Sequence, residues 1–175
     1  ARIMSNQLAL RDAYRKENTN DKKNVDVEKV HQAYKLAKTV AFAQGFNLYR
    51  DASKKYNWNL NLKQIAAIFR AGCIIQAKLL QDIMHAYDDG ADDLLLYPVF
   101  KNEVLENTPA LKEIVVQSID LPLPVFTAAL TYTNQLTSIC LGANIIQGQR
   151  DFFGAHTYQR VDREGFEHHQ WGSHE

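Results

Sequence analysis

A long helical pattern between residues 30 and 52 limits the fold of this chain more than any other feature. Apolar side chains recur at helical spacing from Val30 to Ala52, and Phe42 and Phe46 widen the apolar surface near the middle. A helix that is apolar over so much of its circumference needs cover from other elements on most sides. After a polar connector over residues 16–24, Asn24 or Asp26 can cap this helix.

Start and stop signals divide the rest of the first half into helices. The opening residues carry a short amphipathic pattern that predicts a helix without a visible cap. Asn61 with Gln64 resembles a capping box for a helix through Phe69, and a second helix is expected over residues 74–87.

Prolines mark the predicted helix starts of the second half. Thr108 followed by Pro109 predicts a helix that ends near residue 119, and Pro124 predicts a helix to about residue 140. No stretch alternates apolar and polar residues over four or more positions, so no strand is expected. The sequence predicts an all-α, multi-helix domain over residues 1–156.

Three glycines and a polar tail characterise the last third of the chain. Gly142 and Gly148 interrupt a helical pattern and suggest close helix packing, whereas Gly154 suggests a left-handed helix end. Residues 157–175 show no helical stripe and predict an extended C-terminal tail. Its isolated Phe166 and Trp171 are large apolar side chains, so we expect the tail to lie against another surface.

The charge balance narrows the classes of partner. Lys plus Arg and Asp plus Glu each number 20, so the formal charge is zero and no global field would attract nucleic acid or an anionic membrane. The chain has no run of eighteen apolar residues and no signal peptide, which favours a cytoplasmic protein with no membrane partner. Cys73 and Cys140 lie among apolar residues, as buried thiols do in a reducing compartment.

Arg150 and His156 form the candidate binding pair. A guanidinium can hold a phosphate or carboxylate with two parallel hydrogen bonds, and a histidine can donate to a sugar hydroxyl or phosphate. An ion pair of Arg150 with Asp151 or with a neighbouring helix is the alternative. On an unbroken helix His156 would face away from Arg150, so a shared site requires the helix to end near Gly154.

Other sites find little support. His168, His169 and His174 in the tail superficially resemble a metal site, but adjacent histidines in a tail rarely form a closed tetrahedral set, so no metal is predicted. The sequence has no GxGxxG, no P-loop and no nucleophile elbow, so no residue is assigned to a cofactor or to catalysis.

Three segments resemble one known family. They are ANIIQGQRDFFGAHTYQRVDREG at residues 143–165, AKTVAFAQGFNLYRDASKKYNWNLNLKQIAAIFRAGCII at 37–75, and LPLPVFTAAL at 121–130. All are similar to the C-terminal region of decarboxylating 6-phosphogluconate dehydrogenases, and the likeness covers essentially the whole chain. The sequence departs from the family pattern at Gly142 (usually Pro), Gly148 (Ala), Phe152 (Tyr) and Gln76 (Arg).

The resemblance implies a function and a fold. Family members oxidatively decarboxylate 6-phosphogluconate to ribulose 5-phosphate with NADP, in the pentose phosphate pathway and gluconate utilisation. Their helical C-terminal domain is a duplicated unit, of which this chain resembles the second half. The nucleotide-binding domain and the catalytic lysine and glutamate belong to family segments that this sequence lacks, so we expect the chain to be inactive alone.

The resemblance also implies roles for three residues. Arg150 and His156 match an arginine and a histidine supplied in trans to 6-phosphogluconate, within a homodimer whose tails are exchanged. Arg2 matches an arginine that contacts the substrate phosphate in its own subunit. A non-catalytic helical dimerisation module is the alternative function.

Overall fold

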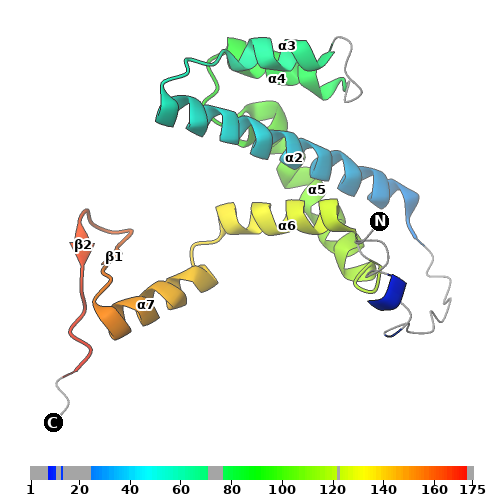
Figure 1. Ribbon diagram of the computed structural model, residues 1–175. Helices are drawn as coiled ribbons and strands as arrows, with labels where there is room; N and C mark the ends of the chain where they lie inside the picture. The colour runs from blue at the N-terminus through cyan, green and yellow to red at the C-terminus, as the bar shows by residue number, and fades with distance from the viewer. Residues whose placement is uncertain (1–7, 11–12, 14–24, 71–76, 122, 173–175) are drawn as a thin grey trace.

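The computed structural model describes residues 8–10, 13, 25–70, 77–121 and 123–172 of the chain. The predicted all-α class is confirmed, since helices account for nearly all regular structure in these ranges (Figure 1). In chain order the elements are α2 (Val27–Tyr56), α3 (Leu62–Arg70), α4 (Leu79–Asp88), the 3-10 helix η1 (Leu94–Leu96), α5 (Pro98–Gln117), α6 (Pro124–Thr137), α7 (Gly142–Gly154), β1 (Tyr158–Gln159) and β2 (Phe166–Glu167).

Helix α2 begins at one of the two predicted caps. The Asp26 carboxylate accepts hydrogen bonds from the backbone N–H groups of Glu28, at 3.0 Å, and Lys29, at 3.4 Å. The helix ends at Tyr56, and the next residue, Asn57, caps it with a left-handed backbone (φ 55°) that suits an asparagine. Helix α2 packs against α5 and α6. The predicted burial on most sides is wrong, because eight of its 30 residues are buried and Tyr34 and Leu48 are 53% and 69% exposed.

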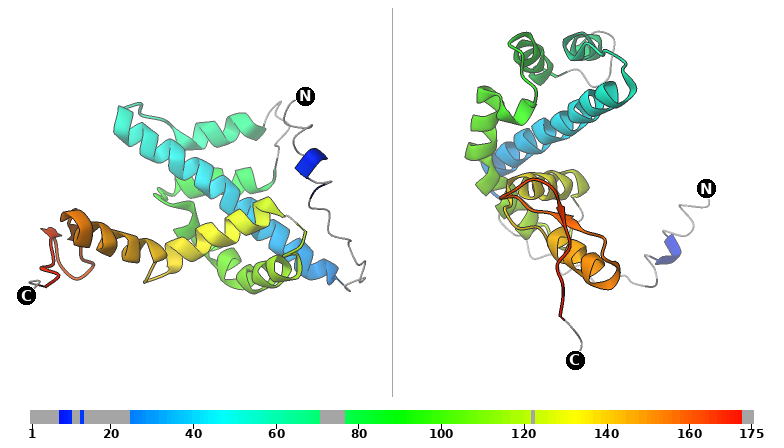
Figure 2. Two further views of the ribbon diagram at one scale, coloured as in Figure 1. Left: turned by 60° about the horizontal axis from the view of Figure 1, so that its bottom comes forward. Right: turned by 90° about the vertical axis from the view of Figure 1, so that its left-hand side faces the viewer.

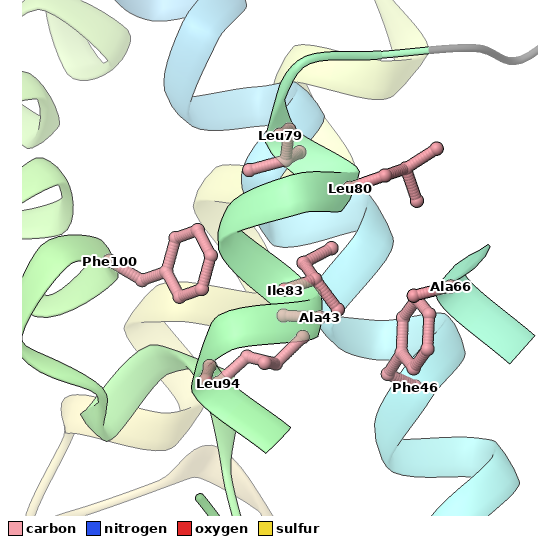
Figure 3. Close-up of a cluster of buried hydrophobic side chains, with 9 residues drawn as sticks. Ala43, Phe46, Ala66, Leu79, Leu80, Ile83, Leu94 and Phe100 are labelled. Carbon is pink, nitrogen blue, oxygen red and sulfur yellow. The ribbon is translucent and has the colours of Figure 1, made fainter. Parts of the chain in front are cut away.

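Helices α3 and α4 lie side by side at one end of α2 (Figure 1). The predicted cap of α3 is present, because the Asn61 side chain accepts a hydrogen bond from the Gln64 N–H at 3.0 Å. Helix α4 begins at Leu79, and the first residues of the helix predicted over 74–87 lie outside the described ranges. A cluster of buried apolar side chains lies where α2, α3 and α4 meet the start of α5, and it includes Phe46, Ile83 and Phe100 (Figure 3).

The predicted helix start at Thr108 and Pro109 is wrong. Helix α5 begins eleven residues earlier, at Pro98, and runs through Pro109. The Thr108 hydroxyl donates to the Val104 carbonyl at 2.5 Å inside this helix. Buried apolar residues on both sides of the proline, Phe100 before it and Leu111 after it, explain the error, because tertiary packing holds a helix through a position that proline weakens.

Helix α6 starts at Pro124 as predicted, and the chain then leaves the packed helices (Figures 1 and 2). We call residues 27–137 the body and residues 142–172 the arm, which comprises α7 and the tail. Within the described ranges every fully buried apolar side chain belongs to the body. The only buried side chain in the described arm is that of Asp151.

The tail contains a short strand pair that the sequence did not predict. Strands β1 and β2 pair antiparallel, with Tyr158 opposite Glu167 and Gln159 opposite Phe166. Each strand has two residues, which is too short to show an alternating pattern. The division into a helical domain over 1–156 and a tail over 157–175 stays a prediction.

Two further expectations concern cysteines and membranes. Cys140 is exposed, so its predicted burial is wrong, and Cys73 lies outside the described residues. Its apolar sequence neighbour Ile139 is also 92% exposed, which shows that this apolar stretch joins α6 and α7 at the surface. Among the described helices none is both long and apolar enough to span a membrane.

Candidate anion-binding site at the end of α7

Helix α7 ends at Gly154, the position at which it must end if Arg150 and His156 are to share a site. Gly154 is its last residue, and Ala155 takes the left-handed conformation (φ 50°, ψ 40°) while its N–H donates to the Asp151 carbonyl at 2.9 Å. The prediction that Gly154 itself is left-handed is therefore wrong by one residue. The reversal at Ala155 takes His156 off the helical path that would have carried it to the far side of α7.

Thr157 also has a left-handed backbone, with φ 58°. This conformation is unfavourable for a β-branched residue and persists only where its surroundings hold it. Both backbone polar groups of Thr157 are held by α7: its N–H donates to Asp151 Oδ1 at 2.9 Å, and its carbonyl accepts from Gln147 Nε2 at 2.6 Å. Residues 155–157 thus form a fixed turn against the helix end.

Asp151 is the centre of the arm. Its fully buried carboxylate accepts four hydrogen bonds, from the Thr157 N–H and His168 Nδ1 on Oδ1, and from the His169 N–H and Trp171 Nε1 on Oδ2. The four distances lie between 2.9 and 3.0 Å. Four acceptances use the full capacity of an ionised carboxylate, which offsets the cost of burying its charge.

The same contacts control the ionisation of this carboxyl. Burial by itself raises the pKa of Asp151, but the hydrogen bonds from His168, Trp171 and the two backbone amides outweigh burial and hold the pKa well below its ordinary value. Asp151 is therefore ionised at neutral pH. An ionised carboxylate only accepts, so His168 must carry its proton on Nδ1 in this contact.

Arg150 does not form the ion pair with Asp151 that the sequence left open. Its side chain is exposed, and its Nη1 donates to Gln147 Oε1 at 3.2 Å. The described residues include no carboxylate within ion-pair distance of this guanidinium. Because the adjacent Asp151 is fully engaged by the tail, Arg150 keeps most of its donors available for an outside anion.

His156 is exposed and lies over the helix end. A Cβ placed on Gly154 would be 3.5 Å from His156 Cδ2, which shows that the ring covers this glycine. Within the described part of the chain no hydrogen bond or ring contact joins His156 to Arg150. Arg2, the third predicted site residue, lies outside the described residues.

The tail folds back on α7 through Trp171. Its indole lies edge-on to Phe152, with ring centroids 5.8 Å apart, and near the ring of His169 at 4.9 Å. Trp171 therefore finds part of its surface on its own chain, whereas Phe166 stays 74% exposed. A Cβ on Gly148 would meet Trp171 at 4.0 Å and one on Gly142 would meet open space, so the close helix packing predicted at these glycines is wrong for this chain.

Two histidines of the tail, His168 and His169, take structural contacts. His168 bonds to Asp151, and the ring of His169 packs against Trp171. The described ranges contain no group of three or more His, Cys, Asp or Glu side chains placed to hold a metal ion.

The sequence did not predict that Asp151 and Gln147 belong to this site. One sequence signal does point to Asp151. An acidic residue in the last turn of a helix interacts unfavourably with the helix dipole, so its presence indicates that other groups stabilise the carboxylate. The role of Gln147 depends on the left-handed turn three residues past the helix, and no local pattern predicts such a turn at a threonine.

The fold and the site together define the class of protein. It is an all-α domain whose last helix exposes Arg150 and carries a tail that folds back on the buried carboxylate of Asp151. A family model described as "6-phosphogluconate dehydrogenase, C-terminal domain" matches residues 1–171. The chain belongs to the 6-phosphogluconate dehydrogenase family, which the sequence resemblance had indicated.

Similar proteins agree with this assignment. The chain is 48% identical over 149 residues to the decarboxylating 6-phosphogluconate dehydrogenase of Salmonella typhimurium, covering 83% of this chain and 32% of that protein. It is 48% identical over 155 residues to the enzyme of Staphylococcus epidermidis, covering 86% and 33%. The chain thus spans about a third of the length of these curated relatives.

A solved structure shares the fold. The 6-phosphogluconate dehydrogenase of Plasmodium falciparum, described in its apo form and in complex with its cofactor NADP+ and with its substrate 6-phosphogluconate, superposes with a TM-score of 0.86. The two are 34% identical, and the match covers 97% of this chain and 38% of the other.

Proposed function

We propose that this chain is part of a decarboxylating 6-phosphogluconate dehydrogenase, which converts 6-phosphogluconate to ribulose 5-phosphate with NADP in the cytoplasm. The relatives with this activity in their names are about three times as long as this chain, which covers about a third of their length. The proposal is supported by the family match over residues 1–171 and by the Plasmodium falciparum enzyme, whose complexes contain NADP+ and 6-phosphogluconate.

The role of this chain is to bind substrate and to join subunits. Its sequence has no glycine-rich turn for a dinucleotide phosphate, so its residues do not fit NADP and none is assigned to that cofactor. None is assigned to proton or hydride transfer either. A nicotinamide accepts the hydride in this chemistry, and a separate acid and base move the protons, so the isolated chain has no activity.

The exposed guanidinium of Arg150 is the observation that carries the proposed site. Its sequence neighbour Asp151 is saturated by tail donors, which leaves Arg150 to hold the phosphate of 6-phosphogluconate. His156 follows the left-handed Ala155 and therefore leaves the helical path, which supports a role in donating to the same ligand. Arg2 contacts the substrate phosphate within its own subunit, as the resemblance implies.

A second subunit completes the site. Helix α7 and the tail expose several large apolar side chains: Ile145 (70%), Ile146 (58%), Phe152 (51%), Phe153 (84%), Val161 (102%) and Phe166 (74%). Apolar exposure of this extent on one arm is typical of a protein interface. We propose a two-fold homodimer in which the arm of each subunit lies against its partner and supplies Arg150 and His156 in trans.

An arginine variant of the complete enzyme tests the site. Arg150→Ala should mainly raise the KM for 6-phosphogluconate and cost about 2–4 kcal/mol in kcat/KM, because a phosphate clamp acts before and during the reaction alike. Arg160→Ala is the matched control, since Arg160 is also exposed in the arm but its guanidinium binds Asp162 through two contacts of 2.7 Å. An unchanged KM in Arg150→Ala removes Arg150 from the site.

The same exposed apolar arm favours a second candidate function, a non-catalytic dimerisation module. The two functions differ in turnover. NADPH absorbance, followed after this chain is mixed with 6-phosphogluconate and NADP, should stay flat under both proposals, whereas the complete enzyme should be active only under the first. NADPH formation by the isolated chain would contradict its assignment as a non-catalytic part.

A further inference from the structure

We propose that Gln147 and Asp151 are positioning residues, which fix the turn over residues 155–157 and thereby set His156 relative to Arg150. The inference rests on the proposed function, because it explains how the same substrate site keeps its shape. Neither residue is assigned a contact with the substrate.

The turn needs support because its backbone is unfavourable. Ala155 and Thr157 both have positive φ values, 50° and 58°, on either side of His156. Non-glycine residues rarely take this conformation, and a β-branched residue does so least readily. Without restraint the segment would relax to an extended path, and the imidazole of His156 would lose its fixed place at the helix end.

Gln147 restrains the turn and Arg150 at once. Its amide nitrogen donates to the Thr157 carbonyl at 2.6 Å, and its amide oxygen accepts from Arg150 Nη1 at 3.2 Å. Only this orientation of the amide satisfies both partners, because a carbonyl only accepts and a guanidinium only donates. A single side chain therefore links the guanidinium to the residue that follows His156.

Asp151 restrains the other side of the same residue. Its Oδ1 accepts from the Thr157 N–H at 2.9 Å, so the two side chains grip the N–H and the carbonyl of one residue from one helix. The remaining lone pairs of the carboxylate hold His168, His169 and Trp171, which brings the end of the tail over α7. The site loop and the tail thus share one anchor.

A purely structural role for Gln147 makes a different prediction. In that case its loss would lower stability but leave substrate affinity unchanged in the folded enzyme. Positioning instead predicts a change in KM with little change in kcat, because a displaced histidine weakens substrate binding without altering the groups that transfer protons and hydride.

The test uses the complete dimeric enzyme and four variants. Gln147→Met keeps the length of the side chain and its helix preference but removes both hydrogen bonds. Asp151→Asn keeps the shape of the side chain but replaces one oxygen by an NH2 group, which cannot accept hydrogen bonds from the donors that contact Asp151. Asp162→Asn, an exposed carboxylate of the tail, is the control, and Arg150→Ala reports whether the site itself is real. The readouts are the KM and kcat for 6-phosphogluconate and the hydrogen exchange of the Thr157 amide.

Gln147→Met should raise the KM about tenfold with kcat nearly unchanged, the size expected when a binding group is misplaced rather than removed. Asp151→Asn should raise it more and should speed exchange at Thr157, and Asp162→Asn should do neither. If Arg150→Ala raises the KM but Gln147→Met and Asp151→Asn do not, the positioning inference is wrong and the proposed function stands. If Arg150→Ala leaves the KM unchanged, the proposed site fails and the inference fails with it.

A double variant separates positioning from general damage. Glycine adopts a positive φ without strain, so adding Thr157→Gly to Gln147→Met should recover part of the lost affinity. A KM that stays fully raised in the double variant, while Thr157→Gly alone is harmless, would show that Gln147 does not act through this turn.

Discussion

The body and the arm are stabilised in opposite ways. The body buries apolar side chains in two clusters, one around Phe46 and Phe100 and one around Leu36 and Leu111. The described arm buries one side chain, the carboxylate of Asp151, and exposes most of its large apolar residues. The body therefore has a hydrophobic core of its own, whereas the arm has a polar anchor and an apolar surface without cover in this chain.

This difference fits the division of tasks proposed for the two regions. A core of packed apolar side chains within this chain stabilises the body. A hydrogen-bonded anchor gives the arm a defined shape, since buried polar groups must be satisfied by specific partners. In the proposed function, this anchor holds the turn next to Arg150 and His156, and the exposed apolar side chains of the arm contact the partner subunit.

The largest effect should come from the core of the body. Phe46→Ala should lower the free energy of unfolding by about 3–5 kcal/mol, because Phe46 is 1% exposed and its removal leaves a cavity. Phe153→Ala, in the arm and 84% exposed, should change it by less than about 0.5 kcal/mol in dilute solution. Urea unfolding of the two variants measures both values, and equal losses would erase the distinction between body and arm.

A buried polar pair in the body should give the next largest effect. The Thr39 hydroxyl donates to the buried carboxylate of Glu103 at 2.6 Å. Thr39→Val keeps the shape and removes this donor, so it should cost about 1–3 kcal/mol of stability. Thr127→Val is the control, because the Thr127 hydroxyl bonds to a backbone carbonyl at an exposed site. A neutral Thr39→Val would mean that Lys35, 3.4 Å from Glu103, satisfies this carboxylate alone.

Acid should loosen the arm through Asp151. Its carboxyl has an ordinary pKa of 3.8 and a much lower pKa in the folded arm, so folding favours the ionised form. The stabilisation is complete above the ordinary pKa and declines as the pH falls from about 4 toward the folded value. Tryptophan fluorescence of a Trp58→Phe variant, which leaves Trp171 as the reporter, should change over this range. A curve that is the same in Asp151→Asn would exclude Asp151 as the cause.

The smallest effect tests a glycine of the arm. Gly148 lies inside α7, and a Cβ there would meet Trp171 at 4.0 Å, an ordinary contact. Gly148→Ala should therefore stabilise the arm by about 0.5–1 kcal/mol through its higher helix preference. Gly165→Ala should do the opposite, since Gly165 has a φ of 106°. Thermal unfolding of both variants checks the two signs, and a loss of stability in Gly148→Ala would indicate that α7 needs the glycine.

The sequence predicted features that depend on neighbouring residues and missed features that depend on distant contacts. Helix caps such as Asp26 and Asn61 depend on neighbouring residues, so they were predicted correctly. The start of α5 depends on the burial of Phe100 and Leu111 in contacts with residues distant in the sequence. The local pattern at Pro109 therefore predicted a helix start in the wrong place. Arg150 and His156 were predicted as site residues from their chemistry and from a resemblance, and their role stays a prediction. The contacts of Asp151 span up to twenty residues, from α7 to Trp171, and no spacing rule predicts them.

The central claim is that the arm of one subunit completes the substrate site of its partner, and mixed dimers of the complete enzyme test it most directly. One variant carries Arg150→Ala, and the other lacks the catalytic lysine that the family resemblance places outside this chain. Each variant alone should be inactive at low substrate concentration. After subunit exchange the mixture should recover about a quarter of the wild-type activity, since half of the dimers are mixed and each has one intact site. No recovery, in a mixture shown to contain mixed dimers, would contradict the claim and place Arg150 in the site of its own subunit.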